Sequence, residues 1–144
     1  MKISTRTRYG IRAMLELAKL YPTGPLQLKI IAKRQDISLK YLEQQMALLK
    51  SAGFIRSVRG SKGGYILNKA PGEITLNDIF TCLESQVVTA ECVQDKQLCS
   101  RSTDCIVRGV WQELQQAIEN VLESITLEDL VKKAQKSNGL DYQI

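Results

Sequence analysis

Apolar side chains recur every three or four residues near the start of the chain. Between Thr5 and Tyr21 they occupy Ile11, Met14, Leu15, Ala18 and Tyr21. This spacing predicts an amphipathic helix, which the proline- and glycine-containing run 22–25 should end. A short second helix is expected around residues 28–35, again with its apolar positions on one side.

The next segment predicts a helix-turn-helix followed by a hairpin. A third helix is expected over residues 39–52, with Ser38 as its N-cap and with Leu42, Met46 and Leu49 facing inward. Two short strands, 54–58 and 64–67, flank a glycine-rich, cationic tip. Three helices followed by a basic hairpin are the order of a winged helix-turn-helix. The predicted fold class is therefore mainly α with a small β-hairpin wing.

The second half of the chain predicts a shorter and a longer helix. Pro71 and Gly72 mark a boundary between a DNA-binding region over residues 1–70 and a second region over 71–144. Thr75 and Asp78 have the spacing of a capping box at the start of a short helix. A polar, irregular loop is expected over about 85–105. Dimerisation helices are expected over about 104–136, the first of them long and reaching residue 125.

One apolar stripe runs the length of the long predicted helix. Its members follow steps of four and three residues, which is a heptad pattern: Val107, Trp111, Leu114, Ile118, Val121 and Ile125. A single helix with so continuous a stripe needs a partner, and we expect a homodimer. Packing of the stripe against the rest of its own chain is the alternative.

Composition narrows the range of functions. The chain has no histidine, which excludes Ser-His and Cys-His catalytic arrangements, and no enzyme is expected. Residues 1–69 hold 14 Lys and Arg against 3 Asp and Glu, whereas residues 70–144 hold 6 against 12. The basic half predicts contact with a polyanion. No apolar run is long enough to span a membrane and no secretory signal is recognisable, so a cytoplasmic location with no membrane partner is expected.

Polar positions of the third helix and of the hairpin tip are the candidate DNA contacts. The second helix of a helix-turn-helix enters the major groove, where Gln can pair with adenine, Glu with cytosine, and Lys with guanine or phosphate. A cationic, glycine-rich tip can follow the phosphate backbone or the minor groove. An ordinary polar surface and a flexible loop are the alternatives. The candidates are Thr5, Arg8, Ser38, Lys40, Tyr41, Glu43, Gln44, Arg59, Gly60, Ser61, Lys62 and Gly63.

Three cysteines lie close together in the polar loop. Cys92, Cys99 and Cys105 are separated by six and five residues, and this spacing lacks the Cys-x2-Cys pairs of zinc knuckles. Three thiolates can ligate an iron–sulfur cluster, which usually takes a fourth ligand. From the spacing, a cluster, a zinc site and free redox-active thiols all stay open. Cys82 falls on the short predicted helix, where a packing role is expected.

These residues resemble the Rrf-two-type winged-helix transcriptional regulators, a family that includes the iron–sulfur cluster regulator IscR, the nitric-oxide sensor NsrR and the cysteine-metabolism repressor CymR. The resemblance covers about residues 1–135. It implies a homodimer that binds partly palindromic, double-stranded promoter DNA through the third helix and the wing. It rests on Arg8-Tyr9, on residues 37–44, on Val58-Arg59-Gly60 with Gly63-Gly64-Tyr65, and on Ile125-Thr126-Leu127.

The resemblance also bears on the cysteines. In cluster-bearing members, which this chain resembles most, three cysteines ahead of the long helix hold the cluster, so Cys92, Cys99 and Cys105 are implied as ligands, most simply of a 2Fe–2S cluster. Arg108 stands where the cluster regulator has histidine, and Arg8 where nitric-oxide sensors can use aspartate. The fourth ligand therefore stays open among Glu, Asp, Cys82, water and a small thiol.

Two other functions remain as alternatives to a cluster-controlled regulator. The first is a regulator of the same fold that senses thiol oxidation or zinc without a cluster. The second, more remote, is a thiol oxidoreductase, which the missing histidine and the missing Cys-x2-Cys pair disfavour.

Overall fold

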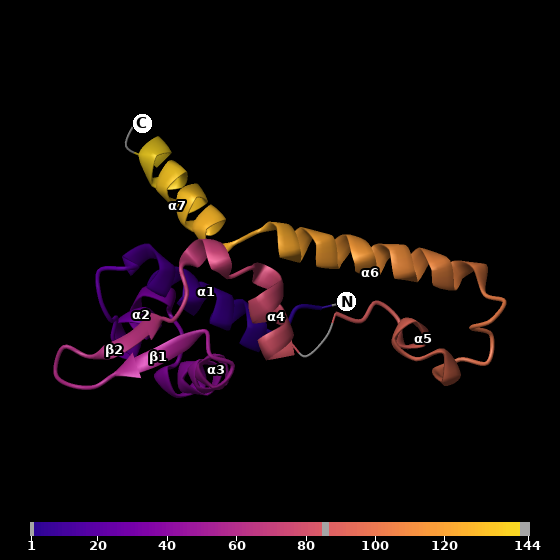
Figure 1. The fold of residues 1–144 in the computed structure, drawn as a ribbon, viewed down its shortest axis with the longest axis horizontal. Coiled ribbons are helices and arrows are strands. Elements are labelled where there is room, and N and C mark those ends of the chain that lie inside the picture. Colours follow the sequence, from indigo (N-terminus) through magenta and orange to yellow (C-terminus); the bar gives the residue numbers. More distant parts are fainter. Residues whose placement is uncertain (1, 85–86, 142–144) are drawn as a thin grey trace.

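The computed structural model describes residues 2–84 and 87–141. The first four helices, a hairpin and the start of the last helix form the body of the molecule, and one long helix extends from it as an arm (Figure 1). The winged helix-turn-helix prediction is confirmed. In chain order the elements are α1 (Thr5–Leu20), α2 (Leu28–Gln35), α3 (Leu39–Ser51), β1 (Ile55–Val58), β2 (Gly64–Leu67), the 3-10 turn η1 (Pro71–Glu73), α4 (Leu76–Glu84), α5 (Glu91–Gln94), the 3-10 turn η2 (Lys96–Leu98), α6 (Ile106–Ser124) and α7 (Leu127–Asp141).

Helix α1 lies at the centre of the body. It contacts α2, α3, α4, α7 and β2. Helix α1 is therefore covered on more sides than the one apolar face that the sequence pattern predicts. Tyr21, which the sequence pattern places inside, is 37% exposed, whereas Glu16 is buried. A helix enclosed on several sides buries positions that a one-sided pattern does not mark. The buried residues of α1 are Thr7, Gly10, Ala13, Met14, Glu16, Leu17 and Ala18.

The second half of the chain completes this core. Ile79 and Leu83 of α4 and Leu127 of α7 are buried in the same cluster as the inner faces of α1 and α3. Helix α4 packs tightly on α1 at Gly10, where a Cβ atom would overlap the Leu83 side chain. The body therefore includes elements beyond residue 70. The division into a DNA-binding region over residues 1–70 and a second region over 71–144 stays a prediction.

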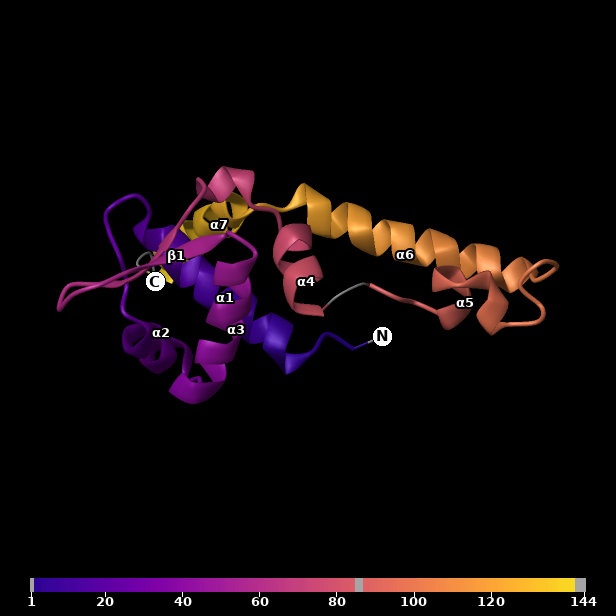
Figure 2. The ribbon, with the colours of Figure 1, turned by 60° about the horizontal axis from the view of Figure 1, so that its bottom comes forward.

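Two capping boxes hold the base of the arm. Thr75 N donates to Asp78 Oδ2 at 2.9 Å and Asp78 N donates to Thr75 Oγ1 at 3.1 Å, which confirms the predicted box. Thr126 and Asp129 repeat the pattern at the start of α7. A short antiparallel bridge pairs Thr75 with Thr126 and fixes the point where α6 leaves the body (Figure 2). Among the described residues, no helix is both long and apolar enough to cross a bilayer.

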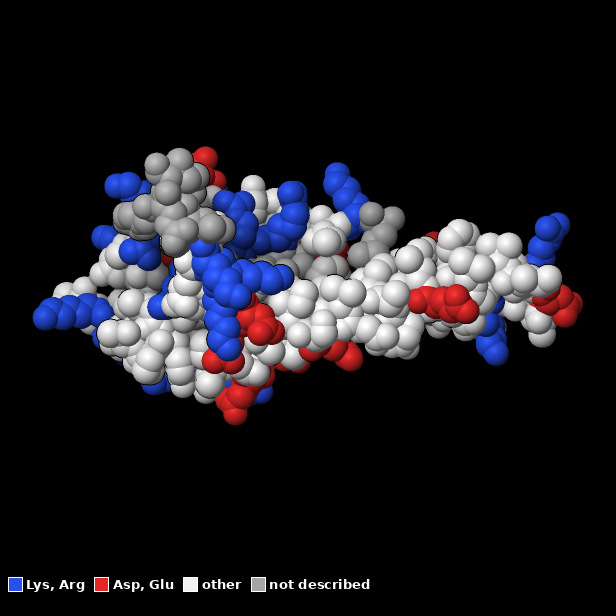
Figure 3. Space-filling view, turned by 90° about the horizontal axis from the view of Figure 1, so that it is seen from above, with Lys and Arg blue, Asp and Glu red and all other residues white. Residues whose placement is uncertain are grey.

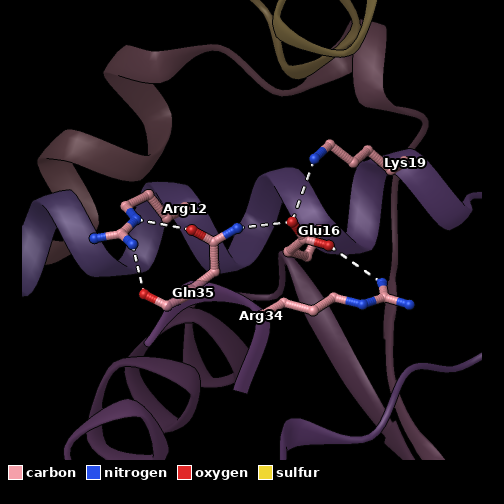
Figure 4. Close-up of polar contacts among 5 residues, drawn as sticks. All are labelled: Arg12, Glu16, Lys19, Arg34 and Gln35. Atoms are coloured by element: carbon pink, nitrogen blue, oxygen red, sulfur yellow. Dashed lines mark hydrogen bonds and ion pairs between the residues drawn. The ribbon is translucent and has the colours of Figure 1, made fainter. Parts of the chain in front are cut away.

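A buried carboxylate ties α1 to the end of α2 (Figure 4). Glu16 is 5% exposed and accepts hydrogen bonds from Gln35 Nε2 at 2.7 Å and from Arg34 Nη1 and Lys19 Nζ at 3.3 Å. Arg12 Nε donates to Gln35 Oε1 at 2.8 Å. Burial acts to raise the pKa of Glu16, but the hydrogen bonds and the Lys19 charge outweigh it and hold the pKa below its ordinary value. The network places the end of α2, and with it the turn that starts α3.

Glu16→Gln should lower the free energy of unfolding at pH 7 by about 1–3 kcal/mol, because a charged acceptor is lost from a buried network. The pKa of Glu16 is lowered on folding, so its contribution is present above its ordinary value of 4.5 and is lost as the pH falls below that value. Urea unfolding at pH 7 and at about pH 3 should show a difference between the two proteins that shrinks in acid. An equal difference at both pH values would contradict the assignment.

Candidate DNA-binding surface and cysteine segment

The start of α3 presents the predicted contact residues to solvent. Ser38 Oγ caps the helix by accepting from Tyr41 N at 3.3 Å. Lys40, Glu43 and Gln44 are exposed. The inner face is closed, as predicted, by the fully buried side chains of Leu42, Met46 and Leu49. Helix α3 therefore has a mainly polar outer face, on which Leu39 and Leu48 are also exposed, and an apolar inner face.

Tyr41 differs from its neighbours on α3. It is half-buried, and its ring packs edge-on against Tyr9 of α1, with 5.7 Å between the ring centroids. The Arg12 guanidinium lies 5.5 Å from the centroid of the Tyr9 ring. Much of Tyr41 is therefore engaged in orienting α3 on α1, and only its exposed part is open to a ligand.

Thr5 and Arg8 lie together at the first turn of α1. Arg8 is exposed, and its Nη2 donates to Thr5 Oγ1 at 3.1 Å. The start of α1 is at the end of the body that faces the arm, away from the wing (Figures 1 and 2). These two candidates are thus separated from the wing candidates by the length of the body.

The wing is fastened to the start of α2. Strands β1 and β2 pair antiparallel, and Leu26 adds to them through reciprocal backbone hydrogen bonds of 3.0 and 2.9 Å with Tyr65. Gly64 permits this approach, because its φ is +149° and a Cβ atom would overlap the Leu26 carbonyl. Gln27 Nε2 also donates to Ser61 O at 3.1 Å. The wing is therefore held beside α2 and α3.

The wing tip contains two kinds of glycine. Arg59, Gly60, Ser61 and Lys62 are exposed, and nothing lies near the position of a Cβ on Gly60. Gly63 is buried, and a Cβ there would overlap the Val58 carbonyl oxygen. Gly63 is thus required to close the hairpin. The four residues before it, 59–62, are accessible to a ligand.

Charge separates along the molecule. In Figure 3 most Lys and Arg side chains lie over the body, while the arm is mainly uncharged or acidic with basic side chains near its tip. Residues 1–69, which fold into α1, α2, α3 and the wing, hold 14 Lys and Arg against 3 Asp and Glu. The positive electrostatic potential of these basic side chains attracts a polyanion.

The cysteine segment folds back along the first half of α6, at the tip of the arm (Figure 1). Cys92 lies in α5, Cys99 directly follows η2, and Cys105 is the N-cap of α6. The expectation of an irregular loop was wrong for α5 and η2, which are short helical turns, and residues 85–86 lie outside the described residues. All three cysteines are free thiols, with Cys99 exposed and the other two half-buried.

The donor set suits an iron–sulfur cluster in its chemistry. Among the described residues, no group of three or more His, Cys, Asp or Glu side chains is gathered closely enough to hold a metal ion, so ligation requires the three thiols to approach one another. Between them lies Ser102, whose Oγ is buried without a hydrogen-bond partner. A buried, unpaired hydroxyl is unusual in a native structure.

Arg108 and Cys82 are not placed as ligands. Arg108 Nε donates to the backbone oxygen of Cys92 at 2.9 Å, so Arg108 holds α5 against the first turn of α6, and a guanidinium has no acceptor to offer a metal. Cys82 Sγ donates to Leu48 O at 3.6 Å, and burial raises the pKa of the Cys82 thiol. Both observations support the packing role expected for Cys82.

The apolar stripe of α6 is uncovered. Every residue of α6 is described and none is buried, and its main contacts within the chain are with α4 and α5. Trp111, Leu114, Val107 and Val121 are between 39% and 57% exposed, and Ile118 and Ile125 are half-buried. Ile106 and Val110 widen the stripe; they fall outside the heptad positions, and the sequence pattern therefore missed them. Packing within the same chain, the alternative expected from the sequence, therefore leaves most of the apolar stripe exposed to solvent.

Known proteins share this arrangement. Residues 3–133 match the family described as "Rrf2: Iron-dependent Transcriptional regulator". The chain belongs to the Rrf2 family of transcriptional regulators. It is therefore a DNA-binding regulator and not an enzyme, which confirms the resemblance and excludes the thiol oxidoreductase.

Relatives in the Rrf2 family include two kinds of regulator. The transcriptional regulator CymR of Bacillus subtilis is 42% identical over 130 residues, 90% of this chain and 89% of CymR. Its solved structure, described as that of the global cysteine regulator, has a TM-score of 0.80 and 40% identity over 92% of this chain and 98% of that one. The regulator IscR of Xenorhabdus nematophila is 36% identical over 99% of this chain and 87% of its own length. The T. potens IscR structure is 40% identical, with a TM-score of 0.78 over 95% and 90% of the two chains.

Gly64→Ala should destabilise the protein by about 2 kcal/mol or more, because the added methyl group overlaps the Leu26 carbonyl at a positive φ. Gly60→Ala is the matched control: its φ is also positive, but the space around it is open. It should cost about 1 kcal/mol. Urea unfolding measures both. Equal stability of the two variants would show that the contact with Leu26 does not require glycine.

Proposed function

We propose that this protein is a homodimeric regulator whose affinity for promoter DNA is controlled by an iron–sulfur cluster on Cys92, Cys99 and Cys105. One observation carries the proposal. The segment that holds the three thiols packs on the start of α6, the helix whose apolar stripe is exposed. A change in the cysteine segment therefore acts directly on the element that would join two protomers.

DNA contact is assigned to the start of α3 and to the wing tip. Lys40, Glu43 and Gln44 are exposed on the outer face of α3 and would meet base edges in the major groove. Arg59 and Lys62 of the wing would contact phosphates or the minor groove. Ser38 and Tyr41 position α3, Gly60, Ser61 and Gly63 shape the tip, and Thr5 with Arg8 would add a contact at the far end of α1.

Dimerisation is assigned to the stripe of α6. Each large apolar side chain transferred from water to an interface contributes about 1.5–3 kcal/mol before the cost of association. The six heptad residues, with Ile106 and Val110 beside them, would contribute a part of this value each, because most of them are already about half covered within the chain. Two protomers joined in this way would present two α3 helices to the two halves of a palindromic site.

Control of DNA affinity is assigned to the three thiols. Bound through three thiolates, an iron–sulfur cluster supplies a redox-sensitive cross-link between α5, η2 and the start of α6. Arg108 already holds the backbone of Cys92 at the first turn of α6, of which Cys105 is the N-cap, and ligation requires the three thiols to approach one another. Ordering costs about 1–2 kcal/mol per backbone residue, and ligation must supply it. The switch requires a difference in DNA affinity between the two states.

Thiol or zinc sensing without a cluster is the second candidate. It is favoured by the three thiols being free and at least partly exposed in the described structure. Accessible thiols can be oxidised directly when they ionise. The two candidates differ in whether the purified protein carries iron and sulfide.

Trp111→Glu should convert the dimer largely to monomer at micromolar concentration, because a charge would enter an apolar interface. Gln112→Glu, a charge at the adjacent exposed position of α6, should leave the dimer intact. Sedimentation velocity measures both. A wild-type protein that sediments as a monomer would remove the dimer from the proposal.

Protein purified without oxygen should contain iron and sulfide and absorb visible light, and Cys99→Ala should lose both, because a thiolate ligand is removed. Cys82→Ala is the matched control and should keep them. Operator affinity should also be measured for three proteins: the loaded wild type, the metal-free wild type and Cys99→Ala. The affinity of the loaded wild type should differ from that of the other two. Iron-free protein would favour thiol or zinc sensing, and equal affinities would show that the cysteines do not control DNA binding.

A further inference from the structure

A groove of about 330 Å³ lies between the starts of α2 and α3 and the base of the wing. Leu28 and Lys29 line it from α2, Leu39 and Glu43 from α3, and glycines from the wing. The wing is fastened on this side by the Gln27–Ser61 hydrogen bond and by the close approach of β2 to Leu26. The groove is therefore a built feature of the body.

Leu39 is the exposed apolar side chain of this groove. It is the first residue of α3 and is 43% exposed, and it is not part of the core cluster that takes up the inner face of α3. Glu43 follows one helical turn later, so the two side chains share a face of α3. An apolar group thus stands beside a carboxylate at the end of the helix assigned to the major groove.

The surroundings of the groove fit DNA. Lys29 lines the groove and is exposed, Lys40 follows Leu39 in the sequence and is exposed, and Arg59 and Lys62 are exposed on the wing whose glycines form the wall. An apolar position on a surface with several exposed cations favours a ligand that carries negative charge on its outside and a small apolar group within reach. Thymine in the major groove is such a ligand, because it alone among the DNA bases presents a methyl group there.

We propose that Leu39 is a specificity-determining residue that contacts the 5-methyl group of one thymine in each half-site. The proposal rests on the proposed function, in which α3 enters the major groove. Leu39 would select thymine by apolar contact, while Glu43 on the same face can accept a hydrogen bond from cytosine. The two residues would then discriminate neighbouring bases by different chemistry.

Deoxyuridine tests this contact, because it differs from thymidine only by the missing methyl group. An operator is first selected from random DNA with the full wild-type chain, and each thymine is then replaced by deoxyuridine in turn. Burial of one methyl-sized group corresponds to about a fourfold change in affinity. We expect one thymine per half-site whose replacement weakens wild-type binding by about this factor. Leu39→Ala should bind the thymine operator about fourfold more weakly per half-site and show no response to that replacement.

Leu48→Ala is the matched control. Leu48 is on the same helix and 41% exposed, but it lies near the other end of α3, so this variant should keep the full deoxyuridine response. The salt dependence of Leu39→Ala should equal that of wild type, because no phosphate contact is lost. Circular dichroism confirms that both variants are folded.

The outcomes separate the two proposals. A wild type that is insensitive to deoxyuridine at every thymine, or a Leu39→Ala variant that keeps the response, would overturn the assignment of Leu39. A reduced salt slope in Leu39→Ala would assign Leu39 to the phosphate backbone and overturn it as well. Failure of the wild type to select any sequence would instead contradict the assignment of α3 to the major groove, and the Leu39 contact with it.

Discussion

The burial of α1 between elements from both ends of the chain is the constraint on which the other positions depend. Because α1 is enclosed on several sides, one of its charged residues is buried, and a buried carboxylate is tolerated only with partners. Glu16 finds them in Lys19 of its own helix and in Arg34 and Gln35 at the end of α2. This pairing sets the end of α2, and Asp36, with a φ of 53°, turns the chain into α3 at once. The orientation of α3 therefore depends on a polar contact between α1 and the end of α2.

The same enclosure defines where the arm begins. Helix α4 lies along α1, where Thr7 Oγ1 donates to Glu84 and Gly10 admits Leu83. The bridge between Thr75 and Thr126 then joins the start of α4 to the start of α7. Since α6 enters this junction at its C-terminal end, its N-terminal half and the cysteine segment are left outside the body. An apolar helix held away from its own core is available to a second chain.

Two chemistries are thus kept apart in the molecule. Residues 1–69, which include α3 and the wing, hold 14 Lys and Arg against 3 Asp and Glu, and the cysteine segment lies at the tip of the arm (Figure 1). Under the proposed function, a signal received at the thiols reaches DNA only through α6 and its partner. The dimer interface is then the element with two arrangements that such coupling requires. Rrf2-family membership accounts for DNA binding, and under the proposal the cysteine segment determines what the chain senses.

The sequence by itself determined the local structure, because helices, caps and turns depend on residues a few positions apart. The predicted bounds of α2 and β2 match the structure, and the spacing of Thr75 and Asp78 was enough to predict the capping box. Tertiary contacts decided the rest. The burial of Glu16 and of Gly63, the exposure of Tyr21 and the use of Arg108 to hold Cys92 each depend on the packing of a neighbouring element or turn. Periodicity reports which face of a helix is apolar, but it does not report how many neighbours enclose that helix or which backbone atom a long side chain reaches.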